Sequence, residues 1–317
     1  MCTSLTYTNT AEQHFFARTM DFPTTTPWRP IFLPRQHHWL TGLNTEHLTQ
    51  QAILGGGRLP SGIDQILMAD GVNESGISCA ELYLPHAVHY APVTQPDKIN
   101  LTPQDFINWV LGEHASLAEV VADLPKVCLV NQTWHGEPYV YPFHWFLSDT
   151  TGQSLVIEPT GGPLIAQSNP SGVLTNTPVL AQHIKNLNQT LGLNDTTVTA
   201  ATIAAAQTWL QTNQPLPTGS IPTNRFNHMA IRRLGTPQLT ATNAQSTLFN
   251  WLDEVRLPYD PAKRHQLSHN YTHYRAVISL DQRRYAFRPR TTERLQSLQL
   301  THEMAINWKS PMIFSAN

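Results

Sequence analysis

The residue with the most distinctive chemistry is Cys2, which directly follows Met1 at the start of the chain. Removal of Met1 would leave a thiol and a free α-amine on one residue, so the same residue would supply a nucleophile and a general base. A free thiol titrates at about 8.5 and an α-amine at about 7.7 to 8.0, so near neutral pH the amine can take the thiol proton and return it to a leaving group. This layout is typical of an N-terminal-nucleophile (Ntn) hydrolase.

The residues around this cysteine predict a β-hairpin that would position it. Residues 2–8 place Thr and Tyr, which favour a pleated surface, among small residues, and residues 15–22 are largely apolar with Arg18 and Asp21 as their charges. Residues three apart in a regular strand face opposite sides of the sheet. Arg18 and Asp21 can therefore serve one site only if this strand ends or bulges between them.

The composition limits the classes of protein to consider. With 317 residues, of which 40% are hydrophobic and 13% charged, the chain is long enough for one large domain or two small ones. The 20 Lys and Arg residues against 22 Asp and Glu give a net charge of -2 without a long basic run, so we expect no nucleic-acid partner. No apolar run approaches the roughly 18 residues of a membrane span and no signal peptide is visible, so we expect a cytoplasmic protein with no membrane partner.

Neither the cysteines nor the histidines predict a metal site. The three cysteines are scattered without CxxC spacing, which also argues against a disulfide framework. Among 15 histidines, His265, His269 and His273 have spacings that align ligands only on a helix, whereas the residues between them favour loop and strand. There is no HExxH motif, so we expect no metal and no cofactor.

Turn residues punctuate the first half of the chain. Residues 55–57 are three glycines, and because neither GK[ST] nor GxGxxG follows, we interpret them as a flexible turn and not as a phosphate loop. Residues 70–76 have the composition of a turn, and the apolar residues 77–84 that follow predict a buried strand. Capping signals at Thr102 and Ser116 predict the starts of two helices.

The rest of the chain alternates blocks of strands with blocks of helices. We expect a meander of antiparallel strands at residues 143–147, 154–159, 164–166 and 172–178. Helices are predicted at residues 198–210, 224–234 and 244–255, and a late hairpin at residues 273–280 and 284–288. Such segregated blocks favour a layered α+β fold over an alternating βαβ fold, and we expect one domain over residues 1–317.

Several short motifs give the chain a family resemblance. They are Cys2, Ala17-Arg18-Thr19-Met20-Asp21-Phe22, Asp70-Gly71-Val72-Asn73-Glu74-Ser75-Gly76, Ile157-Glu158-Pro159, Leu174-Thr175-Asn176-Thr177-Pro178 and Asn224-Arg225-Phe226. In order and spacing, over nearly the whole length, the chain resembles the choloylglycine hydrolase family. That family contains bile salt hydrolases and penicillin V acylases, which cleave the amide between an acyl group and an amine. The resemblance implies the Ntn-hydrolase fold, an αββα sandwich of two antiparallel sheets between helical layers, and a homotetramer.

The resemblance also implies roles for the residues of the hairpin. Cys2 would be the nucleophile and its own α-amine the base. The fixed positive charge of Arg18 would lie against the thiol and favour the thiolate. Asp21 would accept a hydrogen bond from the α-amine and orient it.

The remaining site residues would come from later in the chain. Asn176 would donate its side-chain amide to the oxyanion of the tetrahedral intermediate, joined by the backbone N–H of Tyr83. Arg225 would complete the polar site. Met20 and Tyr83 would contact the substrate.

The residue at position 83 bears on the substrate. Bile salt hydrolases usually carry Asn there and penicillin V acylases carry Tyr, so the resemblance favours phenoxyacetyl-type amides such as penicillin V as the small-molecule substrate. An aromatic ring at Tyr83 suits stacking on a flat phenoxy group. Only Met1 precedes Cys2, which resembles the bile-salt branch, so conjugated bile salts and N-acyl homoserine lactones stay open as substrates.

The same residues also have simpler interpretations. A cysteine at position two can be incidental, Asn176 before Thr-Pro is ordinary turn chemistry, and Arg225 at a helix start could form a surface ion pair. A catalytically silent binding protein on the same fold is therefore the alternative to an enzyme. Retention of Met1 would favour that alternative, because an acylated amine cannot act as a base.

Overall fold

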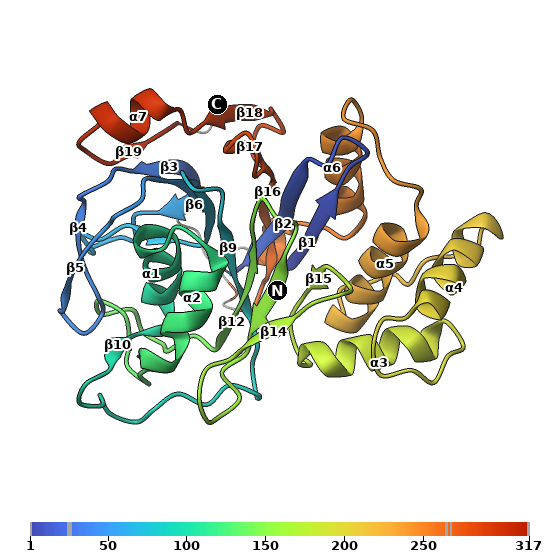
Figure 1. Cartoon of the computed structure of the whole chain (residues 1–317), viewed down its shortest axis with the longest axis horizontal. Coiled ribbons are helices and arrows are strands. Elements are labelled where there is room, and N and C mark those ends of the chain that lie inside the picture. The colour runs from blue at the N-terminus through green and yellow to red at the C-terminus, as the bar shows by residue number, and fades with distance from the viewer. Residues whose placement is uncertain (1, 24–26, 264–265, 267, 316–317) are drawn as a thin grey trace.

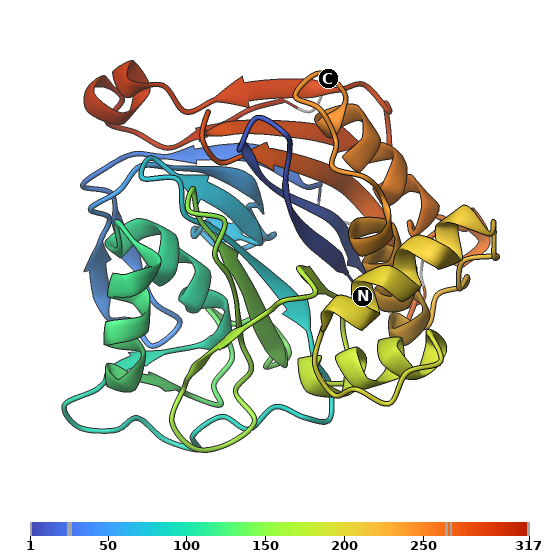
Figure 2. The ribbon, with the colours of Figure 1, turned by 45° about the vertical axis from the view of Figure 1, so that its right-hand side comes forward.

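Two antiparallel sheets form the centre of the molecule, and helices cover both outer faces. The computed structural model describes residues 2–23, 27–263, 266 and 268–315. Figures 1 and 2 show the two sheets between two groups of helices. The four-layer αββα arrangement expected from the sequence is therefore confirmed.

The first sheet has six strands, each antiparallel to its neighbours. In sheet order they are β15 (Val173–Leu174), β1 (Thr3–Thr8), β2 (His14–Phe22), β16 (Tyr271–Ser279), β17 (Arg284–Pro289) and β18 (Gln296–Gln299). The hairpins β1–β2 and β16–β17 confirm the two hairpins predicted from the sequence. Because β2 pairs with β16, the two ends of the chain meet in one sheet.

The second sheet has nine strands and faces the first. In sheet order they are β14 (Ala166–Ser168), β13 (Ser154–Ile157), β12 (Phe143–Ser148), β9 (Ser78–Tyr83), β8 (Asp70–Asn73), β6 (Ile53–Arg58), β3 (Arg29–Leu33) and β19 (Met312–Ile313), with β7 (Leu67–Met68) paired to β6. Two small ribbons complete the strands: β4 (His38–Leu40) with β5 (Glu46–Leu48), and the parallel pair β10 (Ile99–Leu101) and β11 (Val127–Leu129).

Helices form the two outer layers. The nine-stranded sheet is covered by α1 (Phe106–Glu113) and α2 (Leu117–Asp123). The other side carries α3 (Leu180–Thr190), α4 (Ala200–Gln211), α5 (Pro222–Gly235) and α6 (Ala244–Glu254), of which α5 and α6 pack on the six-stranded sheet. The last helix is α7 (His302–Asn307), and the 3-10 turns are η1 (Pro103–Asp105), η2 (Leu124–Lys126) and η3 (Pro261–Lys263).

The predicted helices are all present, but α3 and α7 were missed. The capping signals are confirmed: Thr102 and Asp105 form a capping box at the start of η1, which continues into α1, and the Ser116 side chain caps α2. Neither missed helix starts with a full capping box: α3 follows Val179, which has no capping side chain, and Thr301 caps α7 but has Met304 and not an acidic residue three positions later. Among the described residues, no helix combines the length and the apolar character that crossing a membrane requires.

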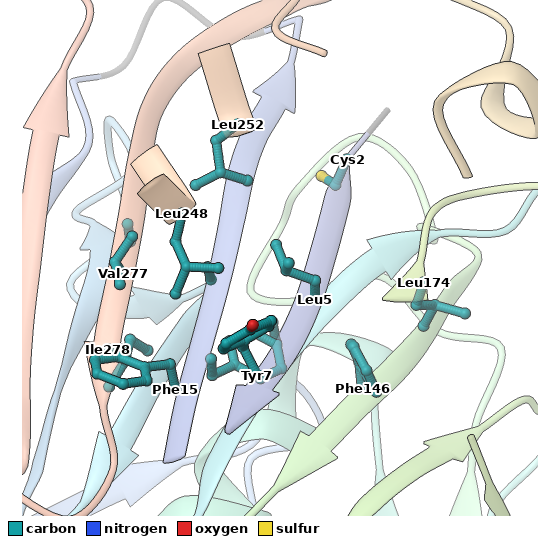
Figure 3. Close-up of a cluster of buried hydrophobic side chains, with 14 of the residues drawn as sticks. Cys2, Leu5, Tyr7, Phe15, Phe146, Leu174, Leu248, Leu252, Val277 and Ile278 are labelled. Atoms are coloured by element: carbon teal, nitrogen blue, oxygen red, sulfur yellow. The ribbon is translucent and has the colours of Figure 1, made fainter. Parts of the chain in front are cut away.

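A hydrophobic core fills the space between the sheets and continues under α5 and α6. It joins side chains of both sheets, such as Phe16 and Phe146, whose ring centroids are 5.3 Å apart. Figure 3 shows Cys2 at the start of β1, together with Leu248 and Leu252 of α6 from the same cluster. A second cluster lies between the nine-stranded sheet and α1 and α2.

The triple glycine at residues 55–57 is not the flexible turn predicted from the sequence. It lies within the buried strand β6. A Cβ atom at Gly56 would lie 2.6 Å from the Tyr285 hydroxyl oxygen and closer still to that of Tyr274. Glycine is therefore required by close packing between the sheets, a contact that the local sequence does not reveal.

Three further predictions need correction. The predicted turn at residues 70–76 is a strand, β8, as far as Asn73, and only the next three residues form the turn. The strand expected at 164–166 is displaced to β14. The stretch 172–178 does not continue the meander, because its strand β15 pairs with β1 of the other sheet, with Leu174 opposite Ser4. This crossing carries the residues after Leu174 to the start of β1.

The end or bulge expected in the strand between Arg18 and Asp21 is absent, and the irregularity lies in the neighbouring strand β16. β2 continues regularly to Phe22. In β16 the register shifts, since Thr272 pairs with Asp21 and Tyr274 pairs with Met20, which leaves His273 as the extra residue. A bulge of this kind bends the strand and redirects neighbouring side chains.

Close packing around Gly56 makes a stability prediction. Gly56→Ala should lower the free energy of unfolding by about 1–3 kcal/mol, because the new methyl group would displace Tyr274 and Tyr285. Gly112→Ala in α1 is the matched control: its nearest atom, Thr49 Cγ2, is 3.1 Å from the new Cβ and alanine favours a helix. Thermal unfolding of the two variants should differ clearly. Equal melting temperatures would show that Gly56 is not constrained.

Candidate active site

Cys2 lies at the start of β1, where β1 pairs with β2. Thr3 pairs with Thr19 in this ladder, so the thiol of Cys2 lies next to the last residues of β2. The Cys2 Sγ accepts a hydrogen bond from Arg18 Nη2 at 3.1 Å and lies 3.7 Å from the carbonyl oxygen of Asp21. A fixed positive charge against a thiol favours the thiolate, which is the reactive form.

The guanidinium of Arg18 is completely buried and is held from several sides. Its Nη1 donates to the Ala69 carbonyl at 2.7 Å and lies 3.4 Å from Asp70 Oδ2. Its Nη2 also lies 3.2 Å from the sulfur of Met20. Burial opposes the charged form, but the electrostatic effects of the Cys2 thiol and the Asp70 carboxylate outweigh burial and raise the pKa of Arg18. Arg18 is therefore a permanent cation beside the thiol.

Asp70 links Arg18 to the opposite sheet. Its carboxylate accepts hydrogen bonds from the hydroxyl of Tyr274, from the hydroxyl of Tyr285 at 2.6 Å and from the Gly56 N–H at 3.0 Å. Burial and the charge of Asp70 raise the pKa of both tyrosines, so they stay protonated donors. The carboxylate that pairs with Arg18 is thus itself fixed by three donors.

Arg225 is the second buried guanidinium of the site. It lies on α5, and its Nη1 donates to Thr3 Oγ1 at 2.7 Å and to Asp21 Oδ2 at 3.3 Å. Its Nη2 donates to Asn176 Oδ1 at 3.0 Å. Burial lowers the pKa of Arg225, and the charge of Asp21 counteracts this effect. Arg225 therefore connects α5 with β1, β2 and the segment after β15.

Asp21 accepts hydrogen bonds from two further hydroxyl groups. Thr19 Oγ1 donates to its Oδ2 at 3.1 Å, and Thr272 Oγ1 on β16 donates to its Oδ1 at 2.6 Å. Hydrogen bonds to a carboxylate stabilise its ionised form. The expected contact between Asp21 and a free α-amine of Cys2 stays a prediction.

The Asn176 side chain bridges Cys2 and Tyr83. Its Oδ1 accepts a hydrogen bond from the backbone nitrogen of Cys2 at 2.7 Å, and its Nδ2 donates to the Tyr83 carbonyl at 2.8 Å. With Met1 attached, the Cys2 nitrogen is an amide and not an amine. An amide Nδ2 carries two hydrogens, so one hydrogen remains for a further acceptor.

The backbone N–H of Tyr83 points away from β12, on the side of β9 that faces Ala69. The next residue, Leu84, donates its N–H to Pro142 at the edge of β12, so by the alternation of an antiparallel ladder the Tyr83 N–H points the other way. Glu81 N–H, on that same side, donates to the Ala69 carbonyl, which also accepts from Arg18. This direction of the Tyr83 N–H is compatible with its expected role as an oxyanion donor, which stays a prediction.

The side chains of Arg18, Met20, Asp21, Asn176 and Arg225 lie together around Cys2. Tyr83 joins them through its backbone carbonyl, and its ring packs against the second hydrophobic cluster. Sequence reasoning missed the residues that support them, namely Thr3, Thr19, Asp70, Thr272, Tyr274 and Tyr285. The family motifs contained Thr19 and Asp70 without indicating a role. The others lie outside those motifs and could be found only from tertiary contacts.

The three histidines whose spacing would suit a metal site on a helix do not lie on a helix. His265 lies outside the described residues, His269 is in a loop, and His273 is the extra residue of the β16 bulge. His273 Nε2 lies 2.8 Å from the Phe22 carbonyl, and burial lowers the pKa of His273 to about 4. The expected loop and strand in this region are confirmed for His269 and His273.

Comparison with known proteins identifies the family. The sequence profile described as linear amide C-N hydrolases, choloylglycine hydrolase family, matches residues 2–314. A bile salt hydrolase/transferase of Clostridium perfringens is 36% identical over 194 residues, which cover 61% of this chain and 58% of that protein. Among solved structures, a mutant conjugated bile acid hydrolase of Clostridium perfringens has a TM-score of 0.82 at 24% identity, covering 100% of this chain and 97% of the other. A penicillin V acylase of Agrobacterium tumefaciens has a TM-score of 0.71 at 22% identity, covering 95% and 87%. The chain therefore belongs to the choloylglycine hydrolase family of linear amide C–N hydrolases.

Proposed function

We propose that the chain, after loss of Met1, hydrolyses the amide bond of penicillin V or a related N-acyl amide with Cys2 as the nucleophile. The observation that carries this proposal is the 3.1 Å contact of the buried Arg18 guanidinium with the Cys2 thiol, on a residue whose own nitrogen is held in the same site. A merely structural cysteine gains little from a buried cation, which is expensive to desolvate.

The reaction has two halves. The α-amine of Cys2 takes the thiol proton, and the thiolate attacks the amide carbonyl to form a tetrahedral intermediate with a negative oxygen. The C–N bond then breaks, the α-ammonium returns the proton to the leaving amine, and the acyl group remains as a thioester on Cys2. Water, deprotonated by the same α-amine, attacks the thioester, and the C–S bond breaks to release the carboxylic acid and the thiol.

The surrounding groups each favour one of these steps. Arg18 would stabilise the thiolate and Asp21 would accept a hydrogen bond from the α-amine, while Arg225 holds the side chains of Asp21 and Asn176 in place. The second hydrogen of Asn176 Nδ2 and the Tyr83 N–H would donate to the oxyanion, and loss of one such donor typically reduces kcat by about 10²–10³-fold. The side chains of Arg18, Asp21, Asn176 and Arg225 are already fixed by hydrogen bonds, so little reorganisation of them is needed during the reaction.

Two classes of substrate compete in this proposal: phenoxyacetyl amides such as penicillin V, and conjugated bile salts. Tyr83 is half-buried on β9, and its ring supports a phenoxyacetyl group over a steroid acid. The relative of Clostridium perfringens that is named a bile salt hydrolase/transferase supports the alternative of conjugated bile salts. N-acyl homoserine lactones would be attacked by the same chemistry. A binding protein without activity is disfavoured by the assembled site.

The proposed assembly rests on the family resemblance, and the proposed location rests on the sequence pattern. We propose a homotetramer in the cytoplasm, as expected from the sequence. The amide substrate would be its small-molecule partner. Light scattering of the purified protein would measure the oligomeric state directly.

Replacing the nucleophile should abolish the reaction. Cys2→Ala should release no amine from penicillin V, and Cys2→Ser should retain partial activity, because a hydroxyl is a weaker nucleophile than a thiol. Amine release with fluorescamine detection measures both. Cys128→Ala is the matched control, since Cys128 lies on β11 away from the site, and it should retain wild-type turnover. Activity of Cys2→Ala at the wild-type rate would exclude the proposed nucleophile.

Exchange at position 83 should change substrate preference. Tyr83→Asn should lower kcat/KM for penicillin V relative to a glycine-conjugated bile salt by about 10-fold or more, within the 1–3 kcal/mol that a pocket contact provides. Tyr83→Phe keeps the ring and should leave the ratio near that of the wild type. A ratio that does not respond to Tyr83→Asn would remove this residue from substrate selection.

A further inference from the structure

Two buried histidines face consecutive carbonyl groups next to the site. His144 Nε2 lies 2.9 Å from the Thr175 carbonyl oxygen, and His183 Nε2 lies 2.7 Å from the Asn176 carbonyl oxygen. Both side chains are inaccessible to solvent. A carbonyl oxygen can only accept a hydrogen bond, so each Nε2 must carry a hydrogen.

The backbone at Thr175 and Asn176 needs such partners because no strand holds it. β15 consists of only Val173 and Leu174, so its pairing with β1 ends one residue before Thr175. Buried carbonyl groups without partners are strongly disfavoured. The two imidazoles therefore donate to the carbonyl groups of Thr175 and Asn176, which have no strand partner after β15 ends.

A single carboxylate ties the two histidines together. Glu158, at the end of β13, accepts with Oε1 from the Leu180 N–H at 2.9 Å and lies 3.2 Å from His144 Nδ1. Leu180 is the first residue of α3, the helix that carries His183. These contacts link the nine-stranded sheet to α3 and to the backbone at Thr175, which follows β15 of the six-stranded sheet.

His183 is more specialised than packing alone requires. Its ring stacks on Phe226 with centroids 4.5 Å apart, next to Arg225 in the chain. Burial lowers the pKa of His183 to about 4, so the ring is neutral near neutral pH and its Nε2 hydrogen serves the Asn176 carbonyl. Its Nδ1 has no hydrogen-bond partner within the described chain. An apolar side chain would fill this space without leaving a polar atom unpaired.

We propose that His183 and His144 are positioning residues for catalysis. They hold the backbone carbonyls of Thr175 and Asn176 so that the side-chain amide of Asn176 points at the oxyanion. This inference rests on the proposed function, because it assigns their effect to the Asn176 donor. Displacement of a catalytic group by about 1 Å can reduce the rate by 10²-fold. Neither histidine touches the substrate, so binding should be largely retained when either is replaced.

The test compares variants that keep or lose the donor. His183→Phe retains the stacking on Phe226 but cannot donate, and it should lower kcat for penicillin V by about 10–100-fold with KM changed less than about 3-fold. His183→Gln, whose amide can reach the same carbonyl, should recover most of the loss. Alkylation of Cys2 by iodoacetamide needs no oxyanion, so its rate should fall much less than kcat in both variants.

A control separates positioning from general loss of packing. Leu187→Ala, which removes buried contacts from α3 but no donor, should lower the melting temperature and leave kcat near the wild-type value. His144→Phe and His144→Gln should repeat the pattern of the His183 pair. Wild-type kcat in both Phe variants, or alkylation slowed as much as turnover, would overturn the proposal.

Crystal structures distinguish failure of this inference from failure of the proposed function. If the wild type turns over no acyl amide, the proposed function fails, but the position of Asn176 can still be compared. We expect its side chain in His183→Phe to leave the contacts with the Cys2 nitrogen and Arg225. An Asn176 side chain that keeps both contacts in His183→Phe would overturn the positioning role independently of activity.

Discussion

The structure depends on burying two guanidinium groups beside one thiol. An unpaired charge inside a protein is destabilising by several kcal/mol, so Arg18 and Arg225 each require a carboxylate and further acceptors. Arg18 pairs with Asp70, which lies in the opposite sheet, and Arg225 on α5 pairs with Asp21 on β2. The pairs therefore join sheet to sheet and helix to sheet. Correct packing of the layers and assembly of the site are one event, because neither charge is satisfied until the layers meet.

This constraint explains features that look unrelated in the sequence. A side chain at position 56 would occupy the space through which the hydroxyls of Tyr274 and Tyr285 reach Asp70, so this residue is a glycine. The strand β15 leaves its neighbours and pairs with β1, which carries Asn176 to Cys2. Charges and dipoles that are fixed before the substrate arrives stabilise a developing oxyanion with little reorganisation, and this is the main catalytic advantage of such a buried network.

Local signals were sufficient for the hairpin, the helices with capping boxes and the residues within the family motifs. They failed where tertiary contact decides the structure. Three consecutive glycines suit a flexible turn as well as a strand that tyrosines pack against closely. The sequence therefore predicted a turn at Gly56, where the structure has a strand. A strand of two residues has no period, so β15 could not be assigned to a sheet. His144 and His183 carry no spacing that links them, because they meet only through the backbone of Thr175 and Asn176.

The central claim is that Cys2 carries the acyl group during turnover. The most direct measurement is intact-mass and peptide mass spectrometry of the enzyme, quenched in acid while it hydrolyses penicillin V. We predict a chain that lacks Met1 and bears one phenoxyacetyl group on its N-terminal peptide, removable by hydroxylamine as a thioester is. An acyl group on any other residue, or turnover by a chain that retains Met1, would contradict the mechanism.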